Sequence, residues 1–152
     1  MPNLPVIVNE GMSCLLANKE ITKKNKQNIE SLFSKTGKTI WLRKESDINK
    51  VTAISGSGPG YIFLFIDAFE KAALNLGLGK EVTRKIIYQT LIGSTYLLTN
   101  EKKDASILAN NIAIKGGTTE AGLQIFKNKQ ILHKTLEKVI KAAYIKATQL
   151  GN

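Results

Sequence analysis

The chain has 152 residues, of which 43% are hydrophobic, which suffices for one domain or for one domain with part of another. Its net charge is +10, but its 22 basic residues include only two arginines, so we predict a lysine-rich solvated surface rather than a nucleic-acid-binding protein. The single cysteine and single histidine exclude an internal disulfide and a zinc site, and no signal peptide or bilayer-spanning apolar run is present, so we expect a cytoplasmic protein without metal.

The first 46 residues have the pattern of a small α/β segment. Its predicted elements, in chain order, are extended residues 5–8 and 13–17, a polar helix over 19–35 and a short strand over 38–43. Glu10-Gly11 is a break between the extended segments, and Gly37 ends the helix. This series is too small for a complete α/β domain, so we interpret residues 1–46 as the edge of one.

The remainder of the chain, residues 47–152, has a helical pattern. The predicted helices cover residues 58–76, 80–99, 104–112, 119–126 and 129–150. The first of them is apolar on nearly every side, which requires burial on more than one face. Because a domain of this size has little interior, we expect a second copy of the chain to pack against this helix.

Two glycine-rich segments are predicted to begin helices and are candidates for binding an anion. The first glycine segment, residues 55–61, is Ser-Gly-Ser-Gly-Pro-Gly-Tyr, and the second, residues 116–119, is Gly-Gly-Thr-Thr. A helix start has unpaired amides and a positive end of the helix dipole, and glycine lets a ligand approach the backbone. The alternative is that both are ordinary helix starts, with Ser57 and either Thr118 or Thr119 as N-caps.

Four motifs, taken in order, closely resemble those of pyrroline-5-carboxylate reductases. They are Met1-Pro2-Asn3-Leu4-Pro5, Glu10-Gly11-Met12, the first glycine segment and the stretch Gly-Gly-Thr-Thr-Glu-Ala-Gly-Leu over residues 116–123. No single motif is decisive, but the set in this order is specific and covers essentially the whole chain. The family passes a hydride from NADPH or NADH to a cyclic imine to make proline. It has an N-terminal Rossmann domain and a C-terminal helical domain that dimerises by interleaving helices, often assembling further.

The resemblance implies a mainly α fold. A helical substrate-binding and dimerisation domain would occupy residues 47–152, preceded by a small α/β remnant of a Rossmann domain over residues 1–46. The Gly-x-Gly-x-x-Gly turn that holds the cofactor pyrophosphate does not occur in this sequence. We therefore expect the chain alone to bind no NADP or NAD and to have no reductase activity. The alternative is a non-catalytic helical dimerisation module that a gene truncation has left.

The resemblance also implies roles for particular residues. The substrate-binding residues would be Ser55, Gly56, Ser57, Gly58, Gly116, Gly117 and Thr118. The last three would hold the substrate carboxylate through their amides, and the catalytic Thr119 hydroxyl would reach the ring nitrogen. Pro2 and Asn3 would contact the nicotinamide end of the cofactor, or else form a strand-edge turn. Ile114-Lys115 stands where the family usually has Ser-Pro, so Lys115 either supplies charge to the substrate or points to solvent.

Overall fold

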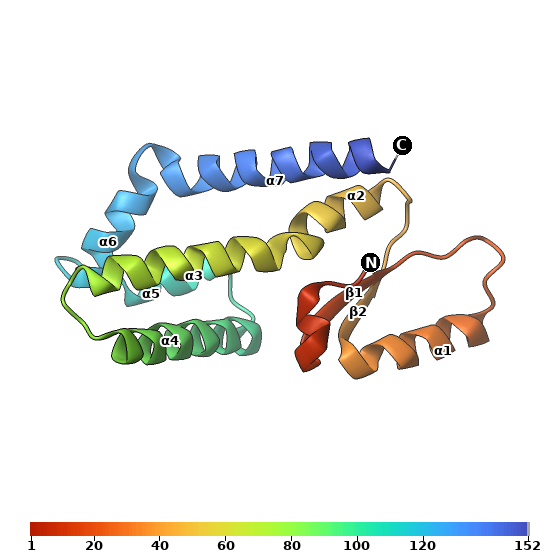
Figure 1. The fold of residues 1–152 in the computed structure, drawn as a ribbon, viewed down its shortest axis with the longest axis horizontal. Helices are drawn as coiled ribbons and strands as arrows, with labels where there is room; N and C mark the ends of the chain where they lie inside the picture. Colours follow the sequence, from red (N-terminus) through yellow and green to blue (C-terminus); the bar gives the residue numbers. More distant parts are fainter. Residues whose placement is uncertain (152) are drawn as a thin grey trace. The chain divides into compact units, whose positions relative to one another are not determined.

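The computed structural model describes residues 1–151, and its helices and strands follow one another largely in the predicted order (Figure 1). The elements are η1 (Leu4–Val8), β1 (Gly11–Leu15), α1 (Lys23–Phe33), η2 (Ser34–Thr36), β2 (Gly37–Trp41), α2 (Asp47–Val51), η3 (Thr52–Gly56), α3 (Gly58–Leu74), α4 (Lys80–Glu101), α5 (Ala105–Ile112), α6 (Thr118–Lys127), η4 (Asn128–Gln130) and α7 (Ile131–Leu150). The chain forms two compact units, one of residues 1–63 with the stretch from residue 136 on, the other of residues 64–135. The predicted fold class, mainly α after a small α/β segment, is confirmed. The domain boundary after residue 46 stays a prediction.

The two strands form a small parallel sheet in the first unit. Gly11 lies opposite Gly37, Leu15 lies opposite Trp41, and α1 is the crossover that a parallel pair requires. Gly37 has a φ of +136°, and a Cβ added there would meet the backbone of Gly11. Cys14 is buried in β1, and this burial raises the pKa of its thiol. The sheet therefore begins at a glycine pair and buries its first strand.

The prediction that residues 5–8 are extended is wrong, because they belong to the 3-10 helix η1. Pro5 occupies an early position of that helix, where its fixed φ suits a helical turn and its missing N–H is not needed. The strand predicted at residues 13–17 begins earlier, as β1. The helix α1 begins later than predicted, because the Thr22 hydroxyl caps it by accepting a hydrogen bond from the Asn25 amide at 3.1 Å.

The helices of the second unit agree closely with prediction, and a three-residue cluster joins two of them. Glu70 on α3 accepts hydrogen bonds from the Tyr88 hydroxyl at 2.7 Å and from Arg84 Nε at 3.1 Å, both on α4. The hydrogen bond from Tyr88, followed by that from Arg84, lowers the pKa of the Glu70 carboxyl. This cluster fastens α3 to α4 within the unit.

Few apolar side chains are buried in the described part of the chain. Those that are buried are Cys14, Leu15, Ala53 and Ile87. The helix α3, predicted to need burial on several faces, leaves Phe63 57% and Leu64 69% exposed. Large exposed apolar surfaces of this kind are typical of interaction sites. Within residues 1–151, none of the helices combines the length and the apolar character that a membrane span needs.

Candidate functional site

The first glycine segment follows helical backbone directly, and α3 begins within it at Gly58, as predicted. The π-helix η3 follows α2 directly, and Ser57 after it keeps right-handed helical angles, φ −83° and ψ −19°. The Ser57 N–H donates to the Thr52 carbonyl at 2.9 Å, and the Gly60 N–H donates to the Ser57 carbonyl at 3.0 Å. Because α2 carries a helical backbone into this segment, both amides already have partners. Ser57 has helical rather than extended angles, so the alternative of Ser57 as an N-cap is wrong, while anion binding at this segment stays a prediction.

Side-chain donors support the π turn that the sequence pattern did not reveal. The Tyr61 hydroxyl donates to the Ala53 carbonyl at 3.2 Å, and the Thr52 hydroxyl donates to the Ile48 carbonyl at 2.8 Å. Ala53 is fully buried. A π turn contains one residue more than an α turn, and these two hydroxyls add hydrogen bonds to carbonyls in and just before it. Such turns often occur at functional sites.

Asn3 of the N-terminal motif makes two hydrogen bonds, one of which joins it to the first glycine segment. The Met12 amide donates to Asn3 Oδ1 at 2.8 Å, and Asn3 Nδ2 donates to Ser55 Oγ at 3.3 Å. A cavity of about 320 Å³ adjoins this pair, and we call it the Asn3–Ser55 cavity. Its lining residues are Asn3, Pro5, Ile54, Ser55, Gly58, Pro59, Ile62 and Phe63. Residues that the sequence suggested separately, for cofactor and for substrate, thus line one cavity within the first unit.

Three other predicted site residues lie outside the lining of the Asn3–Ser55 cavity. Pro2 is exposed, Ser57 lies at the bend that follows the π turn, and Gly56 packs against the N-terminal residue. A Cβ added at Gly56 would come within 2.6 Å of the Met1 side chain, whereas one added at Gly58 would meet no atom within 4 Å. Gly58 therefore leaves open space beside the cavity, and Gly56 permits close packing instead.

The second glycine segment does begin a helix, as predicted. Gly117 is the N-cap of α6, and Gly116 before it has a left-handed φ of +77°. The Gly117 amide donates to the Ile114 carbonyl at 2.8 Å, and the Gly116 amide donates to Glu120 Oε2 at 2.8 Å. Both glycine amides, which the sequence suggested as carboxylate binders, thus have internal partners.

The open donors at the start of α6 include the amides of the two threonines that follow. Within residues 1–151, the amides of Thr118 and Thr119 have no hydrogen-bond partner, as expected for the first turn of a helix. Gly117 is the N-cap and no side chain bonds to the cap, so the alternative of a threonine N-cap is wrong. Thr118 is exposed and Thr119 is half-buried. The segment therefore offers two amides and two hydroxyls at the positive end of the helix dipole.

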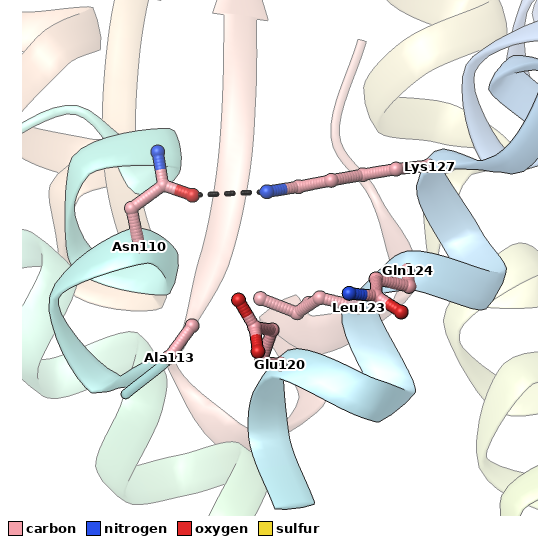
Figure 2. A pocket seen from close by; sticks show the side chains of 6 residues that line it. All are labelled: Asn110, Ala113, Glu120, Leu123, Gln124 and Lys127. Atoms are coloured by element: carbon pink, nitrogen blue, oxygen red, sulfur yellow. Dashed lines mark hydrogen bonds between the residues drawn. The ribbon is translucent and has the colours of Figure 1, made fainter. Parts of the chain in front are cut away.

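Glu120 links the second glycine segment to a cavity beside α6. This cavity, of about 370 Å³, is lined by Asn110, Ala113, Glu120, Leu123, Gln124 and Lys127 (Figure 2). Lys127 extends from α6 toward α5, where its Nζ donates to Asn110 Oδ1 at 3.1 Å. Glu120 is not among the site residues predicted from the sequence, although an acidic residue three positions after an N-cap is a known helix-start signal. Within residues 1–151, no group of three His, Cys, Asp or Glu side chains could hold a metal ion.

Comparisons with known proteins agree on one family. The family model described as pyrroline-5-carboxylate reductase dimerisation matches residues 45–150. The chain is 32% identical to the pyrroline-5-carboxylate reductase of Haemophilus influenzae, across 99% of this chain and 55% of that protein. It is 36% identical to that of Pasteurella multocida, across 88% of this chain and 49% of that protein. The chain thus spans about half the length of the curated relatives it matches.

Two solved structures have the same fold as this chain. The pyrroline-5-carboxylate reductase of Coxiella burnetii superposes with a TM-score of 0.93 at 35% identity, covering 99% of this chain and 55% of that one. The pyrroline carboxylate reductase of Plasmodium falciparum, solved with NADP bound, superposes with a TM-score of 0.92 at 32% identity, covering 100% of this chain and 62% of that one.

Proposed function

We propose, since the chain belongs to the pyrroline-5-carboxylate reductase family, that it supplies the substrate-binding and dimer-forming side of that reaction. In the reaction, a hydride from NADPH or NADH reduces the C=N bond of 1-pyrroline-5-carboxylate and gives L-proline. The observation that carries the proposal is the start of α6, where the amides of Thr118 and Thr119 are open beside two hydroxyls. A small ring with a carboxylate and a nitrogen matches this set of donors.

The carboxylate of the substrate would bind the amides of Thr118 and Thr119. Positive helix ends and free amides favour anions, so this part of the ligand needs no cationic side chain. The Thr119 hydroxyl would form a hydrogen bond with the ring nitrogen, which a hydroxyl can do as donor or acceptor. Gly116 and Gly117 would then shape the turn rather than hold the anion, because their amides are already paired.

The Asn3–Ser55 cavity would hold the nicotinamide end of NADPH or NADH. One side of it is apolar, with Pro59, Ile62 and Phe63, and Asn3 and Ser55 supply its polar groups. A flat heteroaromatic ring with one polar substituent fits such a lining. The cofactor, when bound, supplies the hydride. The relative from Plasmodium falciparum that was solved with NADP bound supports NADP as the cofactor of this family.

We also propose that the protein is cytoplasmic and forms a homodimer through interleaved helices. Besides the exposed face of α3, the second unit has a largely apolar groove of about 470 Å³ along α4 and α5. Its apolar lining residues include Leu97, Leu98, Leu108 and Ile112. Burying such surfaces against a second copy would stabilise the chain by about 25 cal/mol for each Å² of apolar area. The match to a dimerisation family supports a second copy as the occupant.

Calorimetry on the 152-residue chain tests the proposed substrate site. We expect L-proline to bind, and we expect Thr119→Ala to weaken binding about tenfold, the loss of one hydrogen bond. Thr119→Ser keeps the hydroxyl and is the matched control. Cyclopentanecarboxylate, which lacks the ring nitrogen, should bind wild type and Thr119→Ala equally. A chain that sediments as a dimer yet binds neither acid would instead be a non-catalytic dimerisation module.

A further inference from the structure

The hydrogen bonds around Asn3 determine how the Ser55 hydroxyl can act. The Met12 backbone N–H can only donate, so the Asn3 atom that it meets at 2.8 Å is the carboxamide oxygen. The amide nitrogen of the same group therefore faces Ser55 Oγ, 3.3 Å away. Because that nitrogen is a donor, the Ser55 oxygen is the acceptor. The Ser55 proton is consequently free to be donated in another direction.

Among residues 1–151, the Ser55 hydroxyl takes part in a hydrogen bond only as the acceptor from Asn3. Hydroxyls in helical segments commonly donate to the carbonyl one turn earlier, and the Thr52 hydroxyl does so to Ile48 at 2.8 Å. Ser55 forms no such bond as donor, although it is half-buried and lines the Asn3–Ser55 cavity. The half-buried Ser55 hydroxyl, beside an apolar cavity wall, can therefore still donate one hydrogen bond.

We propose that Asn3 is a positioning residue that holds Ser55 as a hydrogen-bond donor to an acceptor oxygen of the ligand in the Asn3–Ser55 cavity. This inference rests on the proposed function, in which a small ring occupies the cavity. The two candidate ligands share a suitable acceptor, because nicotinamide carries a carboxamide and proline a carboxylate on its ring. Asn3 then acts through Ser55, and the predicted direct contact of Asn3 with the cofactor is not needed.

The variant Asn3→Asp reverses the direction of this hydrogen bond with little change in size. One carboxylate oxygen still accepts from the Met12 amide, but the other now accepts from Ser55, so the hydroxyl turns away from the ligand. Ser55→Ala removes the donor altogether. We expect each variant to weaken binding about tenfold, equivalent to about 1.4 kcal/mol. The double variant should bind no more weakly than Ser55→Ala alone, because the two changes remove the same hydrogen bond to the ligand.

The measurement is a titration of the isotope-labelled 152-residue chain, by NMR, with nicotinamide mononucleotide and separately with L-proline. The probe whose binding depends on Ser55 identifies the source of the acceptor oxygen. Ser55→Thr keeps the hydroxyl and should bind that probe like wild type. Slow hydrogen exchange of the Met12 amide in Asn3→Asp shows that the local fold persists, whereas Asn3→Ala should lose this protection.

Two results would overturn the role of Asn3. One is binding by Asn3→Asp equal to wild type for both probes. The other is a double variant whose loss is the sum of the single losses, which would indicate independent structural effects. If L-proline binding depends on Thr119 but no probe depends on Ser55, only the role of Asn3 fails. If the wild-type chain binds neither probe, the proposed function fails as well.

Discussion

Gly116 and Gly122 allow a direct test of the left-handed backbone at the second glycine segment. A Cβ added at either position would meet no heavy atom within 4 Å, so steric contact contributes at neither. The two differ in conformation, because Gly116 has a φ of +77° and Gly122 lies within α6. We therefore expect Gly116→Ala to lower the free energy of unfolding by about 1–2 kcal/mol. Gly122→Ala should raise it by about 0.5–1 kcal/mol.

Guanidinium unfolding followed by circular dichroism measures both changes, at one fixed protein concentration because self-association also contributes to stability. Gly116→Asn is the matched control, since asparagine tolerates left-handed angles better than alanine and should lose less. Alanine variants that change stability with the same sign, or a Gly116→Asn variant as unstable as Gly116→Ala, would refute the effect assigned to the left-handed φ of Gly116.

Three further predictions concern hydrogen bonds and the sheet. Glu120→Ala should speed hydrogen exchange of the Gly116 amide about tenfold or more, because that amide loses its acceptor. Glu120→Gln should keep the amide protected, because its side-chain carbonyl still accepts. Equal NMR exchange rates in the two variants would contradict the hydrogen bond between Gly116 and Glu120. The hydrogen bond from Tyr88 lowers the pKa of the Glu70 carboxyl, so the ionised carboxylate should stabilise the fold fully above the unfolded pKa of about 4.3 and lose this effect as pH falls through the folded pKa. The difference in melting temperature between wild type and Glu70→Gln should therefore shrink in acid, and a difference that stays constant with pH would refute this role of Glu70. Gly37→Ala, which would place a Cβ against the facing strand at a left-handed φ, should cost about 3 kcal/mol or more in urea unfolding, and a near-neutral effect would contradict the glycine pairing.

Apolar periodicity was sufficient to predict the long helices of this chain. The patterns of residues 80–99 and 129–150 predict helices that correspond to α4 and α7, because 3.6-residue spacing persists over many turns. Short segments were harder, since few residues carry each pattern. The apolar run 5–8 has the composition of a strand, yet the proline at its start favours the helical turn that forms.

The sequence suggested some of the residues that line the Asn3–Ser55 cavity, but not the contacts between them. Asn3 and Ser55 were suggested separately, and the hydrogen bond between them joins positions that no local pattern connects. It was harder still to predict which backbone amides of the glycine segments are free and which are paired. Whether an amide is open depends on its partner, and the carboxylate that pairs with Gly116 is set by the conformation of a single side chain, that of Glu120.

The π turn of Thr52–Gly56 also sets the rotational register of the helix that follows it. An α-helix advances about 100° for each residue, so deleting one residue from the turn would restore regular winding and rotate the start of α3 by about that angle. Ile62 would then leave the wall that it shares with Asn3 and Ser55. The extra residue in this turn therefore places Ile62 in the cavity wall, and a one-residue deletion here would change the lining of the Asn3–Ser55 cavity even though every lining residue kept its identity.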